Sequence, residues 1–89
     1  MLKARFYSDD QDIVQLTTHS AFAMIVHPKS IAFSQMKDNR ILNYYCEISA
    51  SDDATTIVSA HSESYRTQQY YVYALNSNNE IVIFDANLS

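Results

Sequence analysis

Hydrophobic and polar residues alternate along much of this chain, and a period of two is typical of β-strands with one buried face. In residues 41–50 the even positions are mostly apolar and the odd positions mostly polar. β-Branched and aromatic residues fill residues 55–60, 69–75 and 80–85, with turn-forming residues between them. We therefore predict strands over these four segments. A further short strand is predicted over residues 2–7, where the same alternation occurs.

Two other segments carry signals of short helices. Ser8 can act as an N-cap with Gln11 as its partner three residues later, and the acidic residues that follow suit the positive end of a helix dipole. These signals predict a helix over residues 9–18 that turns Ile13, Val14 and Leu16 inward. A second helix is predicted over residues 29–36, with Pro28 near its first position.

Residues 20–26 fit either element, because short apolar runs cannot be assigned by periodicity alone. As a helix, the segment would bury Phe22, Ile25 and Val26. As a strand, it would place Phe22, Met24 and Val26 on one face. We favour the strand.

These elements together predict the fold class. Residues 61–67 are polar and are expected to form a loop between strands. The predicted fold is α+β: a twisted antiparallel β-meander of four to five strands with one or two short helices packed on one face. Residues 1–89 are expected to form a single compact domain.

The 89 residues include no glycine, and this absence excludes several classes of function. A phosphate-binding loop, a dinucleotide fingerprint and the sharp turn of a serine hydrolase nucleophile all need glycine. Turns must use Asn, Asp, Ser or Pro28 instead, and Asn and Asp best tolerate a left-handed backbone.

Charge, hydropathy and cysteine content indicate which partners and which cellular location to expect. The net charge of −4 and the scattered basic residues argue against binding to nucleic acid. No apolar run is long enough to span a membrane, so a membrane partner is not expected. The lone Cys46 cannot form an intrachain disulfide, which favours a cytoplasmic location.

The residues able to do chemistry do not form a recognisable site. His19, His27, His61 and Cys46 have no metal-ligand spacing, so no metal or other cofactor is expected. Cys46 alternates with apolar residues and is expected to be buried and inert. The acidic clusters are explained by capping and by turns, so we expect no catalytic residues; these clusters are Asp9, Asp10 and Asp12, and Asp52 and Asp53.

Besides the absence of glycine, the seven tyrosines are an unusual feature of the composition. In residues 69–75, Tyr71 and Tyr73 share a face with Leu75, while the opposite face is also apolar. Residues 80–85 repeat this pattern, so both faces of the sheet need cover. Either these tyrosines form an interface with another molecule, or they belong to an unusually aromatic core; both interpretations stay open.

The order helix, strand, proline-initiated helix and β-meander is similar in outline to phage inhibitors of uracil-DNA glycosylase, which imitate DNA with an acidic surface. That family carries a Glu-Ser-hydrophobic motif at a strand edge. This chain has His19-Ser20-Ala21-Phe22 there, and Lys29 and Ser30 follow Pro28 where that family is acidic. The resemblance implies a small stoichiometric inhibitor, and it transfers no functional residue.

The leading hypothesis is a non-catalytic protein-binding domain. It would act as an inhibitor or adaptor of a partner protein, or assemble with copies of itself, through Tyr45, Tyr71, Tyr73 and Ile81. One alternative is an acidic DNA mimic, which requires the two acidic clusters and Glu47 to form one surface. Another is a small enzyme or ligand-binding domain using His19, His27 or His61, which predicts a histidine hydrogen-bonded to a carboxylate or to Cys46 in a concave site.

Overall fold

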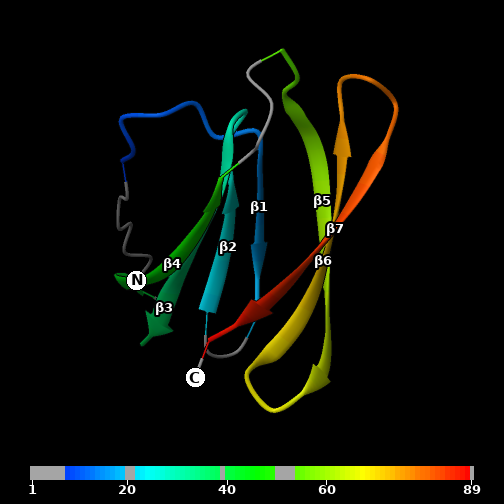
Figure 1. Ribbon diagram of the computed structural model, residues 1–89. Helices are drawn as coiled ribbons and strands as arrows, with labels where there is room; N and C mark the ends of the chain where they lie inside the picture. Colours follow the sequence, from blue (N-terminus) through cyan, green and yellow to red (C-terminus); the bar gives the residue numbers. More distant parts are fainter. Residues whose placement is uncertain (1–7, 20–21, 39, 50–53, 89) are drawn as a thin grey trace.

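Two antiparallel sheets form the part of the chain that the structure describes, and no helix occurs there (Figure 1). The computed structural model describes residues 8–19, 22–38, 40–49 and 54–88, except for the side chains of 42–48. Sheet A has the strand order β1-β2-β3-β4 and sheet B the order β5-β6-β7. The strands are β1 (Gln15–Thr18), β2 (Phe22–Val26), β3 (Ser30–Lys37), β4 (Arg40–Ser49), β5 (Ile57–Arg66), β6 (Gln69–Asn76) and β7 (Ile81–Asn87).

The hydrophobic core lies between the facing sides of the two sheets. Alternation along β2 sends Phe22, Met24 and Val26 into this core, which confirms the strand favoured for this segment. Sheet B contributes Val72 and Ala74 of β6 and the C-terminal end of β7. The two layers therefore form a small β-sandwich.

The predicted helix over residues 9–18 is wrong. The Asp9 carboxylate accepts a hydrogen bond from the backbone N–H of Gln11 (3.0 Å), so it stabilises a local turn rather than a helix start. Residues 15–18 form β1, in which Leu16 lies opposite Ile25 of β2. The residues expected to face inward are exposed: Ile13 by 47%, Val14 by 42% and Leu16 by 53%. β-Branched residues at 13, 14, 17 and 18 suit this extended backbone better than a helix.

The predicted helix over residues 29–36 is also wrong, and with it the α+β fold class. Pro28 and Lys29 form a two-residue connection, in which the backbone N–H of His27 donates to the carbonyl of Ser30 (2.8 Å). The following residues form β3, between β2 and β4, where Ile31 and Phe33 are fully buried. A strand follows the Pro28–Lys29 connection because the central β3 buries apolar side chains on both faces, Ile31 and Phe33 on one and Ala32 on the other.

The polar segment 61–67 was expected to be a loop, yet β5 continues to Arg66. Its outward residues His61 and Glu63 are exposed, while the small Ser62 between them is buried against the core. The period of two is therefore present, but a serine occupies the inward position and conceals it.

The other predicted strands are confirmed where the structure describes them. These are the segments 41–50, 55–60, 69–75 and 80–85, which correspond to β4, β5, β6 and β7. The predicted strand over 2–7 and the turn residues 51–53 lie outside the described residues. Positive φ angles occur at Asp38 (52°), Gln68 (58°) and Asn79 (62°), and two of these three are of the residue types expected to replace glycine.

Candidate protein-binding face

The side of sheet B that points away from the core carries the candidate site. Because Val72 and Ala74 point into the core, their neighbours Tyr71, Tyr73 and Leu75 point the other way. The antiparallel register places residues of β5 and β7 beside them on the same side. We call this side the outer face; it consists of Ser59, His61, Glu63 and Tyr65 of β5, Tyr71, Tyr73 and Leu75 of β6, and Ile81, Ile83 and Asp85 of β7.

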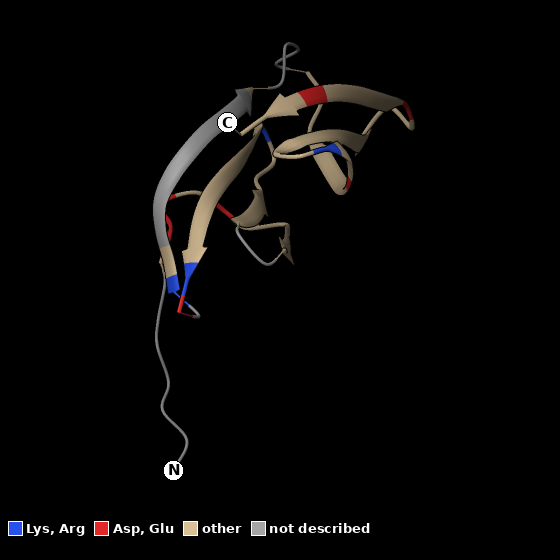
Figure 2. Cartoon of the chain, turned by 90° about the horizontal axis from the view of Figure 1, so that it is seen from below, with Lys and Arg blue, Asp and Glu red and all other residues tan. Residues whose placement is uncertain are grey.

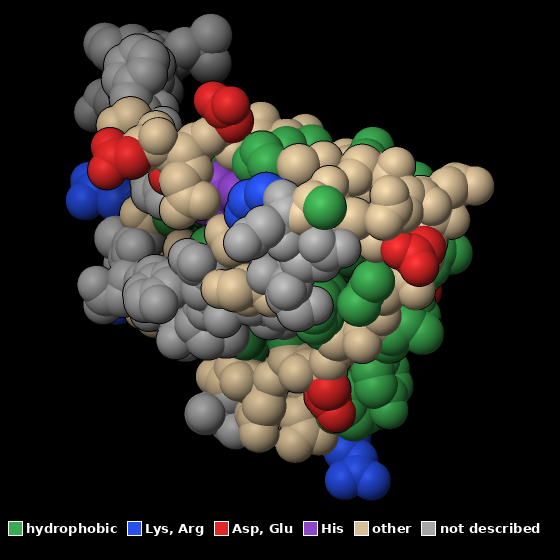
Figure 3. Space-filling view, turned by 45° about the horizontal axis from the view of Figure 1, so that its top comes forward, with side chains coloured by type: hydrophobic (Ala, Val, Ile, Leu, Met, Phe, Trp, Pro, Cys, Tyr) green, Lys and Arg blue, Asp and Glu red, His purple; other side chains and the backbone are tan. Residues whose placement is uncertain are grey.

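The outer face exposes more large apolar side chains than a small soluble domain usually leaves in one place. Ile81 is 69% exposed, Ile83 60% and Tyr71 38%. In the space-filling view, hydrophobic side chains gather along the side of the molecule formed by sheet B (Figure 3). Contiguous apolar surface of this kind marks interaction sites, whereas scattered apolar residues do not.

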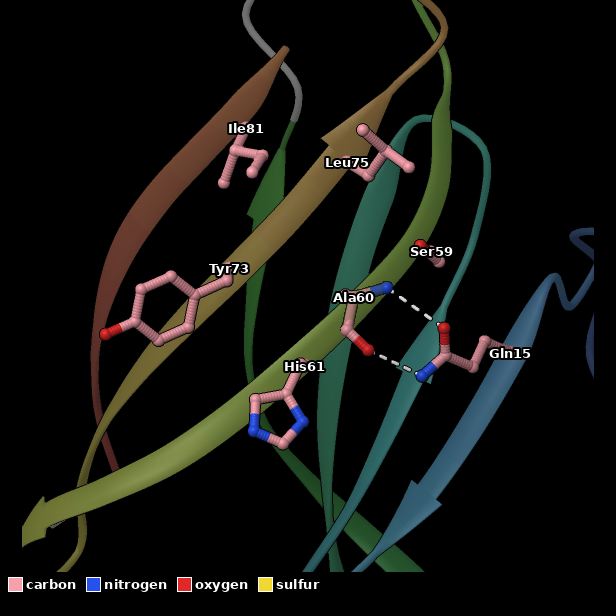
Figure 4. A pocket seen from close by; sticks show the side chains of 7 residues that line it. All are labelled: Gln15, Ser59, Ala60, His61, Tyr73, Leu75 and Ile81. Atoms are coloured by element: carbon pink, nitrogen blue, oxygen red, sulfur yellow. Dashed lines mark hydrogen bonds between the residues drawn. The ribbon is translucent and has the colours of Figure 1, made fainter. Parts of the chain in front are cut away.

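A shallow hollow of about 380 Å³ lies over one end of this face (Figure 4). Tyr73, Leu75 and Ile81 supply apolar lining, and the imidazole of His61 stands at its border. The His61 Nε2 atom lies 3.1 Å from Oε1 of Glu63, and both side chains are largely exposed. The full lining is Gln15, Ser59, Ala60, His61, Tyr73, Leu75 and Ile81.

Gln15 of β1 fixes the edge of sheet B next to this hollow. Its side-chain amide donates to the carbonyl of Ala60 (2.5 Å) and accepts from the backbone N–H of the same residue (3.0 Å) (Figure 4). Nearby, His19 Nε2 lies 2.9 Å from the Ser62 hydroxyl. These bonds from sheet A satisfy polar groups along the β5 edge.

At the opposite end of the outer face, Tyr65 spans all three strands of sheet B. Its ring stacks on Tyr71, with centroids 4.2 Å apart, and its hydroxyl donates to Oδ1 of Asp85 on β7 (2.6 Å). The hydrogen bond to Asp85 is the main cause that raises the pKa of Tyr65 from 10.0 to about 12, since the carboxylate stabilises the protonated phenol. The stacked rings of Tyr65 and Tyr71 therefore form an aromatic surface on the same face as the exposed Ile81 and Ile83.

The charged residues of segment 54–88 are mostly acidic. They are Glu63, Arg66, Glu80 and Asp85. Arg66 ends β5 and Glu80 precedes β7, whereas Glu63 and Asp85 lie within these two strands; Figure 2 colours the charged positions along the backbone. The outer face thus has an apolar centre with a mainly acidic border.

His27 belongs to a different, internal cluster. Its Nε2 atom lies 2.8 Å from Oδ2 of Asp9, and its Nδ1 atom lies 3.4 Å from the Ser30 hydroxyl. Asp, His and Ser in contact resemble the composition of a hydrolase triad. However, His27 is 1% and Ser30 is 4% exposed, so no substrate could reach the hydroxyl in this arrangement. The cluster ties residues 8–14 to sheet A.

The structure brings three of the four predicted binding residues together. Tyr71, Tyr73 and Ile81 lie on the outer face of sheet B. Tyr45 belongs to β4 in sheet A, and its side chain lies outside the described residues. Sequence reasoning missed Tyr65, because it lay in the segment assigned to a loop. The spacing of His61, Glu63 and Tyr65 was the signal that could have found it.

Other sequence predictions fall on residues that the structure does not describe. The side chains of Cys46 and Glu47, and residues Asp52 and Asp53, are among them. The DNA-mimic hypothesis needs these acidic residues and stays untested. Its outline resemblance to glycosylase inhibitors also depended on two predicted helices, over 9–18 and 29–36, that the structure does not contain.

Within the described part of the chain, no group of three or more His, Cys, Asp or Glu side chains could hold a metal ion. No helix there is long and apolar enough to cross a membrane. Comparisons with protein-family models, curated proteins and solved structures gave no match.

Proposed function

We propose that the protein is a non-catalytic binding domain that covers a site on a partner protein with the outer face of sheet B. The exposure of Ile81 and Ile83 beside the Tyr65–Tyr71 stack carries this proposal. Tyrosine suits such a surface because it buries a large area while its hydroxyl can stay hydrated. An inhibitor or an adaptor would both use the face in this way.

Charge indicates the chemistry of the partner. The apolar centre favours an apolar patch on the other protein, and the mainly acidic border favours Lys or Arg around that patch. Such a complex should form faster and bind more tightly at low salt than at high salt, because salt screens the charges at its border.

Ile81→Ala tests the proposal with Leu16→Ala as a matched control. Both residues are exposed aliphatic side chains, but Leu16 lies on β1 of sheet A. Each variant and the wild-type chain would be immobilised and exposed to an extract of the native host, and bound proteins would be quantified by mass spectrometry. We expect a set of proteins that wild type and Leu16→Ala retain and that Ile81→Ala loses. Truncating Ile81 should cost about 1–4 kcal/mol of binding free energy if it is one of the dominant contacts.

Melting curves of both variants would establish that they fold. If the three chains retain the same proteins, or none retains any, the outer face is not a site for a partner protein.

A second candidate function is a small-ligand site at His61. The Nε2 atom of His61 lies within hydrogen-bond distance of a carboxylate, and the residue borders a hollow, as this hypothesis required. The side chains of His61 and Glu63 are largely exposed, and water competes with a small ligand for exposed polar groups. This exposure favours the protein-binding function over the small-ligand site. The variant His61→Gln distinguishes the small-ligand site from the protein-binding function. It should abolish binding of a small ligand but only weaken binding of a partner protein.

A further inference from the structure

Strand β7 forms one edge of sheet B. Its register with β6 runs without a shift from Ile81 to Asn87, and no other strand pairs with it in the described part of the chain. The opposite edge of the same sheet, along β5, is bonded by Gln15 and His19 of sheet A. Side chains from outside sheet B therefore bond to its β5 edge, whereas no strand pairs with its β7 edge in the described part of the chain.

The backbone groups that β7 presents outward can be identified from its hydrogen bonds. The N–H of Asn76 donates to the carbonyl of Glu80 (2.9 Å), and the N–H of Leu88 donates to the carbonyl of Gln68 (2.8 Å). In an antiparallel pair such bonded positions alternate, so even-numbered residues from 80 to 88 bond toward β6. The backbone N–H and C=O groups of Ile81, Ile83 and Asp85 consequently point to the other side.

Residues 81–84 of this edge lack the features that usually prevent strands from pairing. Exposed edges commonly carry Lys, Pro or a β-bulge. Residues 81–84 are Ile-Val-Ile-Phe, and their exposed members are apolar on both faces, with Val82 40% exposed. An added strand would satisfy the outward backbone groups and cover these side chains together.

We propose that β7 pairs antiparallel with β7 of a second copy of this chain, about a twofold axis at Ile83. In this alignment Ile83 faces its own copy, Val82 faces Phe84, and Ile81 faces Asp85. Apolar residues then meet at the centre, and neither Glu80 nor Asp85 faces a carboxylate of the partner strand. The sequence of β7 is thus complementary to itself in the antiparallel direction.

The dimer would join two three-stranded sheets into one continuous sheet and place two outer faces side by side. This pairing uses the backbone edge, so it does not rest on the proposed function of the outer face. Each chain carries a net charge of −4, so the two copies repel, and the dimer should become tighter as salt rises. A basic partner strand in the same place would show the opposite salt dependence.

Sedimentation equilibrium of the full chain tests the pairing. Wild type should approach the dimer mass as concentration rises, with a smaller dissociation constant at high salt. Ile83→Lys places two like charges opposite each other at the axis and should weaken the dimer at least tenfold. Leu16→Lys, a similar change on sheet A, and Tyr73→Ala, a change on the central strand β6, should leave it intact.

A mixed sample of isotope-labelled and unlabelled chains identifies the register. We expect an intermolecular nuclear Overhauser effect between the α-protons of Val82 in one copy and Phe84 in the other. A monomer at all concentrations up to about 1 mM, or a dimer that Ile83→Lys leaves unchanged, overturns the proposal. A monomer that still loses partner proteins through Ile81→Ala would leave the proposed function standing.

Discussion

At the scale of single residues, the bond between the Tyr65 hydroxyl and Asp85 is the most direct chemical mark of the outer face. It joins the first and last strands of sheet B across the stacked ring of Tyr71. The hydroxyl donates only while it is protonated, and this is why the pKa of Tyr65 rises to about 12.

This raised pKa predicts a pH dependence. Because the folded-state value exceeds the unfolded value of 10.0, the stability that the bond gives is complete below pH 10 and is lost as pH rises toward about 12. Asp85→Asn should bring the pKa of Tyr65 down toward 10.0, as followed by the ring carbon resonances of Tyr65 in NMR. Glu63→Gln, at another carboxylate of the outer face, is the control and should change it little. A Tyr65 pKa that stays near 12 in Asp85→Asn would contradict this assignment of cause.

At the scale of elements, the sequence predicted strands well and helices badly. β4 was foreseen from its period of two, and β6 and β7 from β-branched and aromatic residues between turn-forming residues, whereas β2 was favoured over a helix without a decisive period. The predicted helix over 9–18 relied on Ser8 as a cap and on the acidic residues after it. In the structure Asp9 instead makes one tertiary hydrogen bond, to His27, and one local hydrogen bond, to Gln11. Local capping signals cannot reveal a partner 18 residues away.

The contact between Asp9 and His27 predicts an effect on stability. Asp9→Ala leaves the buried Nε2–H of His27 without its acceptor, which should lower the free energy of unfolding by about 1–3 kcal/mol. Asp10→Ala is the matched control, since Asp10 is an exposed neighbour and should change stability by less than about 0.5 kcal/mol. Urea denaturation at neutral pH measures both. Equal stabilities of the two variants would mean that the cluster does not anchor residues 8–14.

At the scale of the whole molecule, the two sheets differ in what they leave uncovered. Sheet A buries both sides of β2, since Ala23 and Ile25 are 0% and 1% exposed opposite the main core. Sheet B buries one side and leaves the other open to solvent. The sequence predicted that both faces of a tyrosine-rich sheet need cover, and Tyr71, Tyr73 and Ile81 share the outer face in the structure. That these three residues and Tyr45 bind a partner stays a prediction. The sequence could not show that the cover would be a second sheet, because facing sheets are related by contacts distant in sequence.

In a single chain the outer face is exposed to solvent and therefore accessible to another protein. Isoleucine methyl groups report directly on the exposure of this face, because isoleucines occur both on the outer face and in the buried core. With ¹³C-labelled isoleucine and a soluble paramagnetic agent, we predict strong relaxation of the Ile81 and Ile83 methyl groups. The methyl groups of Ile25, Ile31 and Ile57 should be protected. If the Ile81 and Ile83 methyl groups in the monomer are as protected as those of Ile31, the outer face is already covered within one chain and is not a free binding surface.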